Sequence, residues 1–250
     1  MGGEGPPLVL LHGMGGNAHW WDPVAPALAA RHRVLALDFR GHGDSSWSEP
    51  PAYQLEDYAA DLESVRGALS LGKIRVAAHS LGARVALRHA ALHPQTVERL
   101  AALDFLAEFW GTNKERHERR RARRQPSFAD PEAMARRFHL EPDKTALSPD
   151  ALAALGRTAI RPAEGGRWTW KFDWRAFDID YPPVWPMLSG VKAPCLIVRG
   201  EHSTVMPRGE FERSVRELPE ARGVEIAGAY HHVTLDAPQA TADALLKFFP

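Results

Sequence analysis

Short apolar runs alternate with longer amphipathic segments through the first part of the chain. The apolar runs are continuous, which is typical of strands that are buried on both faces of a parallel sheet. The segments between them carry apolar residues at three- and four-residue steps, which predicts helices with one buried face. This alternation indicates an α/β fold with a parallel sheet. The predicted strands span 7–12, 34–38, 74–78 and 99–104, and the predicted helices span 18–30, 54–71 and 81–92.

The alternation stops near residue 105 and returns near residue 191. The segment between these points carries a dense run of charges, then mostly helical patterns, and then closely spaced tryptophans. We therefore predict a sheet core formed by 1–105 and 191–250, and an inserted helical lid (cap) formed by 106–190. In the second part of the core, the pattern predicts strands at 193–200 and 223–227 and helices at 208–218 and 238–249.

Composition places the chain among ordinary globular proteins. Its 250 residues are 44% hydrophobic and 25% charged, and 31 basic side chains balance 31 acidic ones. The zero net charge gives the whole chain no attraction to nucleic acid or to an anionic membrane. No apolar run approaches the roughly 18 residues that a membrane helix needs, and the first residues lack the pattern of a signal peptide. We predict a cytoplasmic protein with no nucleic-acid or membrane partner.

The single cysteine and one run of basic residues leave the prediction of an ordinary globular protein unchanged. The single cysteine, Cys195, excludes an intrachain disulfide and a cysteine-based zinc site. Residues 114–124 contain seven basic and two acidic side chains, a pattern that also occurs in surfaces that bind phosphate groups or nucleic acid. Because the rest of the chain offsets this charge, we interpret the run as an exposed lid helix.

Residues 78–82 read Ala-His-Ser-Leu-Gly and lie between a predicted strand and a predicted helix. A serine on such a sharp turn is pushed out of the sheet edge. Small residues are needed two positions before and after it, because the backbone passes close to its neighbours there. Ser80 is therefore the candidate nucleophile, and a chance serine at a helix start is the alternative. Ala78 replaces the usual glycine and is still small.

A serine hydroxyl needs a base to take its proton. The candidate base is His231, in the loop after the last predicted strand, and His232 is the second choice. Two backbone N–H groups are also needed to hold the negative charge that develops on a substrate carbonyl oxygen. The candidates are those of Leu81, at the helix start, and Met14, just after the first predicted strand.

Together these motifs resemble those of the α/β-hydrolase family, in the branch with a helical cap inserted after the sixth strand. The resemblance rests on His-Gly at 12–13, on Asp-Phe-Arg-Gly-His-Gly-Asp-Ser at 38–45, on the Ser80 turn, and on His231 followed by Asp236. It covers nearly the whole core and is weak across the lid. It implies a serine–histidine–acid triad, a small-molecule acyl substrate, no metal and no organic cofactor.

The sequence departs from the family pattern at its beginning. Family members usually have two antiparallel strands before the strand that ends in His-Gly, whereas only six residues precede Pro7. The resemblance therefore predicts a six-stranded, mostly parallel sheet without the first two family strands. Either a second copy of the chain covers the exposed edge, as in a homodimer, or the sequence is a trimmed form of the protein.

The sequence also departs where family members place the triad acid. After the seventh family strand they typically read Gly-x-x-Asp, whereas residues 200–203 read Gly-Glu-His-Ser and put Ser203 in the acid's place. We prefer Asp104, because it ends the sixth family strand at the same sheet edge and some branches use an acid there. Glu201 is the alternative, and the third option is a chain with no triad acid and no activity.

These residues predict an enzyme that hydrolyses a carboxylic ester or a related acyl bond through an acyl-enzyme on Ser80. Trp20 and Trp21, which follow the oxyanion loop, and His79, which precedes the nucleophile, are candidate substrate-binding residues. The alternating aromatic residues at 168, 170, 172 and 174 either line a substrate pocket or fill the core. Thioesters, lactones and carbon–carbon bonds of β-diketones suit the same triad. The alternative of another class is a non-catalytic ligand-binding protein with this fold.

Overall fold

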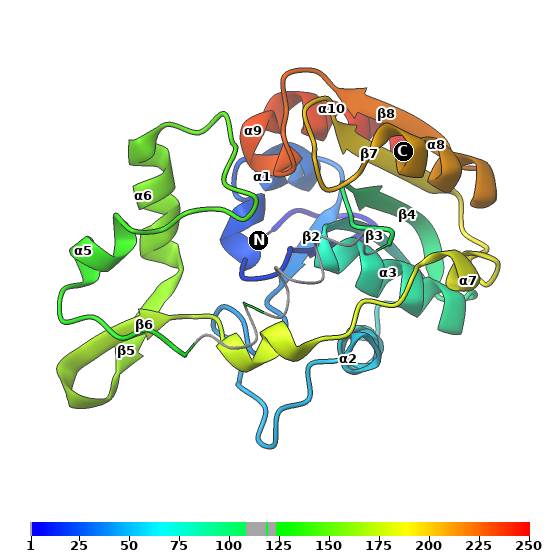
Figure 1. Ribbon diagram of the computed structural model, residues 1–250. Coiled ribbons are helices and arrows are strands. Elements are labelled where there is room, and N and C mark those ends of the chain that lie inside the picture. The colour runs from blue at the N-terminus through cyan, green and yellow to red at the C-terminus, as the bar shows by residue number, and fades with distance from the viewer. Residues whose placement is uncertain (1, 109–118, 120–123) are drawn as a thin grey trace.

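The computed structural model describes residues 2–108, 119 and 124–250, and a parallel sheet forms its centre (Figure 1). Among these residues the sheet has six strands in the order β2-β1-β3-β4-β7-β8, and every neighbouring pair is parallel. The strand order reverses between β1 and β3. In open parallel sheets, ligand sites form at such a point, outside the carboxyl ends of the strands. The strands span Pro7–Leu11 (β1), Arg33–Leu37 (β2), Ile74–His79 (β3), Val97–Leu103 (β4), Cys195–Gly200 (β7) and Arg222–Ile226 (β8).

Alternate residues of the strands pack into two cores on opposite faces of the sheet. In β1, Leu8 and Leu10 contact one core while Val9 and Leu11 contact the other, because successive side chains of a strand point to opposite sides. All six residues of β3 are buried, which explains its continuous apolar run. Helices α1 and α10 complete the first core, and α2, α3 and α8 complete the second. The helices of the core span Ala25–Ala29 (α1), Leu55–Ala68 (α2), Leu81–Leu92 (α3), Arg208–Glu217 (α8), Val233–Asp236 (α9) and Pro238–Phe248 (α10).

The helix predicted within 18–30, with its start near Asp22 and Pro23, is shorter than predicted. The structure has a short 3-10 helix, η1, at Ala18–Trp21, followed by the separate helix α1. Pro23 and Pro26 lack the N–H group that a continuous helix needs, and Pro26 instead occupies the first turn of α1. The other predicted core elements are present with small shifts at their ends. None of the helices in the described part of the chain combines the length and apolar character that crossing a membrane requires.

The segment 106–190, called the lid below, is less helical than predicted. Besides helices it contains two antiparallel strands, β5 and β6, and the glycines of the turn between them have positive φ. Figure 1 shows this hairpin beside α5 and α6, away from the central sheet. Most of the basic run 114–124, which was predicted to be an exposed helix, lies outside the described residues. The lid elements span Pro131–Ala135 (α5), Pro149–Thr158 (α6), Ile160–Ala163 (β5), Arg167–Trp170 (β6), Trp174–Asp178 (η3) and Trp185–Leu188 (α7).

Arg84 of α3 forms hydrogen bonds with the lid near both of its ends. Its side chain is 1% exposed and donates hydrogen bonds to the backbone carbonyls of Leu106 and Pro182. Burial lowers the pKa of Arg84 to about 10, and the two carbonyls compensate for the water that the guanidinium loses. The lid therefore leaves and rejoins the core beside the same helix.

The first residues of the chain run along the outer edge of the sheet. An isolated antiparallel bridge joins Gly2 to Val34 of β2, the strand at that edge. Edge strands present unpaired backbone groups that a second copy of a protein can use. Pairing of this edge in a homodimer stays a prediction.

Candidate active site

Ser80 lies at the sharp turn between β3 and α3, where its φ is 55° and its ψ is −116°. A positive φ is strained for a residue other than glycine, and close neighbours hold it here. The N–H of Gly82 donates to the carbonyl of His12 at 3.1 Å, and a Cβ on Gly82 would lie 2.7 Å from that oxygen. This close approach explains the small residue two positions after Ser80.

His231 and Asp104 continue a line of side chains that begins at Ser80. His231 Nε2 lies 3.1 Å from Ser80 Oγ, and His231 Nδ1 lies 2.7 Å from Asp104 Oδ1. His231 is 3% exposed and Asp104 is 0% exposed, so water has little access to the bond between them. The three residues follow strands β3, β4 and β8, whose carboxyl ends meet at one edge of the sheet. The fold thus brings together groups that are far apart in the sequence.

The carboxylate of Asp104 has further donors besides His231. The Ser203 hydroxyl donates to its Oδ1 at 2.6 Å, and the Gly200 N–H donates to its Oδ2 at 2.8 Å. Hydrogen bonds of this kind offset the cost of burying a charge. Ser203 stands where the family usually places an acid in the sequence. Its hydroxyl instead donates to the carboxylate of Asp104, which follows another strand, β4.

Glu201 does not contact His231. Its Oε2 accepts a hydrogen bond from the Gly228 N–H at 2.8 Å, and its side chain is 47% exposed. Among the described residues, Asp104 is the acid of the two sequence candidates that meets the imidazole.

The two predicted oxyanion residues border Ser80. A Cβ on Gly13 would lie 3.1 Å from Ser80 Cβ, so the loop after β1 passes beside the serine, and Met14 is the next residue. Leu81 is the first residue of α3, and the first N–H groups of a helix have no partner within the helix. Both residues therefore lie next to Ser80 in the fold.

His79 and His232 surround His231. The ring centroid of each lies 4.7 Å from that of His231. Burial lowers the pKa of both side chains well below its usual value, and electrostatic interaction with the neighbouring His231 ring lowers it further. His79 Nε2 pairs with the backbone carbonyl of His231 at 2.9 Å, so the neutral ring donates from this nitrogen. Burial therefore disfavours a positive charge on both rings, and His79 helps to hold the loop that carries His231.

A cavity of about 290 Å³ lies beside the loop that follows β1, bordered by residues of the core and of the lid. Trp20 lines it, whereas Trp21 packs in the core with Leu8 and Leu10. His79 is 1% exposed and does not line the cavity. Of the three predicted substrate-binding residues, only Trp20 is therefore in its wall. The lining residues are Met14, Gly15, Gly16, Asn17, Trp20, Pro126, Phe128, Arg137, Phe138, His139, Leu140, Glu141, Ala159, Trp170, Lys171, Phe172, Trp174 and Phe177.

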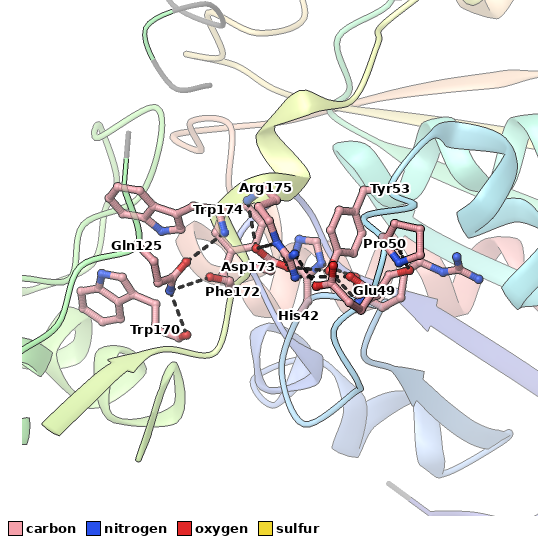
Figure 2. A network of polar contacts seen from close by, with 12 residues as sticks. His42, Glu49, Pro50, Tyr53, Gln125, Trp170, Phe172, Asp173, Trp174 and Arg175 are labelled. Atoms are coloured by element: carbon pink, nitrogen blue, oxygen red, sulfur yellow. Dashed lines mark hydrogen bonds and ion pairs between the residues drawn. The ribbon is translucent and has the colours of Figure 1, made fainter. Parts of the chain in front are cut away.

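Figure 2 shows how part of this wall is held against the core. Gln125 Nε2 donates to the carbonyl of Phe172, and Gln125 Oε1 accepts from the N–H of Trp174, each at 3.0 Å. Between these residues, Asp173 is 2% exposed and accepts a hydrogen bond from the Tyr53 hydroxyl at 2.6 Å. The network therefore ties two aromatic residues of the cavity wall to the loop that precedes α2.

Trp170, Phe172 and Trp174, which the sequence places either in a substrate pocket or in the core, line the cavity. Most of the remaining wall was not predicted. Phe128, Phe138 and Leu140 come from a stretch without a regular pattern, and they approach Trp20 only because of the way the lid folds. Gln125, which binds the backbone of this wall in Figure 2, also lies in a stretch without a regular pattern. For the wall residues in 168–174, the sequence does contain a pattern, because aromatic residues recur at every second position. This spacing is typical of a strand with one aromatic face.

Comparisons with known proteins agree with this geometry. Residues 6–238 match the family model of the alpha/beta hydrolase fold. The chain is 28% identical to 2-(acetamidomethylene)succinate hydrolase of Mesorhizobium japonicum, over 98% of this chain and 88% of the relative. It is 29% identical to an esterase of Mycobacterium tuberculosis, over 96% of this chain and 81% of the relative.

A solved structure supports the same likeness. The crystal structure of E-2-(acetamidomethylene)succinate hydrolase superposes with a TM-score of 0.86 at 28% sequence identity. The match covers 99% of this chain and 92% of the other chain. The likeness therefore extends over the lid as well as the sheet.

Proposed function

The chain belongs to the α/β-hydrolase fold family, and on this premise we propose that it is a serine hydrolase that cleaves a carboxylic ester or a related acyl bond. The observation that carries the proposal is the line of contacts from Ser80 through His231 to Asp104, at 3.1 and 2.7 Å. The similarity to proteins named as hydrolases and an esterase supports the same class of reaction.

In the proposed reaction, Ser80 Oγ attacks the carbonyl carbon of the substrate while His231 Nε2 takes the hydroxyl proton. The oxyanion that forms accepts hydrogen bonds from the N–H groups of Leu81 and Met14. His231 then gives the proton to the leaving alkoxide, which departs as an alcohol and leaves an acyl-enzyme. Water attacks this ester with His231 as the base again, and release of the acid restores Ser80.

Asp104 has two roles in this proposal. It keeps the proton of the neutral imidazole on Nδ1, so that Nε2 can accept the proton of Ser80. Its negative charge then stabilises the imidazolium that forms. The hydrogen bonds from Ser203 and Gly200 hold the carboxylate in the orientation that both roles need.

Fluorophosphonate labelling tests the proposal directly, because these reagents react with activated serine hydroxyls. We expect one label per chain, on Ser80, and no label in Ser80→Ala. His231→Ala should react far more slowly, since its serine lacks the base. Peptide mass spectrometry locates the label. A wild-type chain that folds but takes no label on Ser80 would instead be a non-catalytic ligand-binding protein.

The apolar wall of the cavity favours a substrate with a bulky apolar group that binds there. Its wall includes the side chains of Trp20, Phe128, Phe138, Trp170 and Phe177. Burial of apolar surface stabilises a bound group by about 0.8 kcal/mol per methylene. We therefore expect the enzyme to hydrolyse esters with larger apolar groups more efficiently than esters with small ones.

A panel of aryl esters with acyl chains of increasing length measures that selectivity. We expect kcat/KM to rise by up to about fourfold for each methylene until the cavity is full, as the burial energy implies. Trp170→Ala should flatten this rise, whereas Trp47→Ala, a tryptophan outside the cavity wall, should leave it unchanged. Equal slopes in the two variants would contradict the assignment of this cavity to the substrate.

A second candidate substrate carries carboxylates, as does the succinate named for one relative. Two cationic side chains, Arg137 and Lys171, line the same cavity, although Lys171 also pairs with Asp44 at 2.7 Å. Adding esters that carry a carboxylate on the acyl chain to this panel separates the two candidates, because a substrate of this kind would then be hydrolysed faster than apolar esters of equal size.

A further inference from the structure

Glu63, His89 and His93 form a cluster at the opposite end of α3 from Ser80. His89 and His93 are four residues apart, at the last turn of α3 and at its C-terminal cap, so their side chains lie on the same side of the helix. Glu63 faces them from α2. One possible ligand atom from each residue lies within 4.8 Å of the other two.

These groups have the chemistry of a transition-metal site. Two imidazole nitrogens and one carboxylate oxygen are ligands that Zn²⁺ and related divalent ions bind at about 2.0–2.2 Å. His89 Nε2 already lies 2.9 Å from Glu63 Oε2, which is close to the separation of about 3.3 Å between two ligands of a tetrahedral zinc ion. Glu63 is 29% exposed, so solvent can supply the ion and a fourth ligand.

His89 is unusual within this cluster. Its side chain is fully buried, and its Nδ1 has no hydrogen-bond partner among the described residues. A helix also favours positive charge near its C-terminus, where the cluster lies.

We propose that Glu63, His89 and His93 bind one divalent transition metal ion of the Zn²⁺ type, which ties α2 to the C-terminal end of α3. The ion has a structural role in this proposal, since the cluster and Ser80 lie at opposite ends of α3. Arg66 is its competitor, because its guanidinium pairs with Glu63 at 2.6 Å. The guanidinium must release one carboxylate oxygen when the metal binds.

Calorimetric titration of the untagged full chain with Zn²⁺ tests this proposal, with metal-dependent change in the thermal unfolding midpoint as a second readout. We expect one ion per chain and a higher unfolding midpoint. Affinity should fall by roughly tenfold or more in both Glu63→Gln and His93→Ala, because even the loss of a partner that only supports a ligand costs about that much. Arg66→Met should bind Zn²⁺ more tightly, since it frees Glu63.

Two control variants separate this site from other histidines. His19→Ala removes an exposed histidine that pairs with Asp22 at 2.8 Å, and His232→Ala removes one member of the histidine group around His231. Both should keep the zinc affinity and the rise in unfolding midpoint. Absence of binding would overturn the proposal, as would binding that survives in both Glu63→Gln and His93→Ala.

Discussion

Ser80→Ala is expected to lower kcat for a short-chain aryl ester by about 10³-fold or more, in line with the loss of a triad nucleophile in serine hydrolases. The reason is chemical, because alanine has no oxygen to form the acyl-enzyme. The Oγ of Ser80 lies 3.1 Å from His231 Nε2, so the substitution removes one partner of that contact. Steady-state kinetics with a chromogenic ester measures the effect.

The matched control for this variant is Ser64→Ala. The Ser64 hydroxyl is exposed on α2 and donates to the backbone carbonyl of Ala60, so its removal should leave kcat unchanged. The unfolding midpoints of both variants show whether each still folds. A folded Ser80→Ala protein with the wild-type rate would rule out Ser80 as the nucleophile.

Asp104→Asn is expected to lower kcat by about 10⁴-fold, the size of the loss when a triad carboxylate becomes an amide. The Gly200 N–H donates to Asp104 Oδ2 at 2.8 Å, so the amide oxygen of asparagine should face this donor. The amide NH₂ then faces His231 Nδ1, where the carboxylate now accepts a hydrogen bond. His231 must move its proton to Nε2, and it can no longer take the proton of Ser80.

Glu201→Gln distinguishes the two acids that the sequence leaves open. Glu201 accepts from the Gly228 N–H and lies away from His231, so the glutamine variant should keep nearly the wild-type rate. Rates of both variants are compared under identical conditions, with circular dichroism as the check on folding. A severe loss in Glu201→Gln, together with a mild one in Asp104→Asn, would transfer the acid role to Glu201.

The sheet and the position of the nucleophile follow from local sequence patterns. The continuous apolar run at 74–78 predicts a strand that is buried on both faces, and all residues of β3 are buried. The small residues around Ser80 predict a turn with close backbone contacts, and Gly82 makes such a contact with His12. These patterns are local, because each reflects the geometry of a few consecutive residues.

The lid is less predictable for a physical reason. Much of it lies between short helices and strands, where the chain is irregular and leaves no regular spacing of apolar residues. The prediction of a mostly helical lid missed the strands β5 and β6, since a short strand leaves few residues in which to recognise alternation. The aromatic residues of the cavity wall outside 168–174 were hard to predict for a related reason, because they belong to stretches without a regular pattern.

The sequence by itself determined the α/β sheet, the turn at Ser80 and a short set of partners for it, because strand burial and tight turns impose requirements on neighbouring residues. Only the tertiary structure shows that Asp104 contacts the His231 ring at the sheet edge and that Glu201 contacts Gly228 instead. The contact of Asp104 depends on the donors that hold its carboxylate there, from β7 and the loop after it. Contacts between groups so far apart in the chain leave no pattern in the sequence, since they exist only once the strands are side by side.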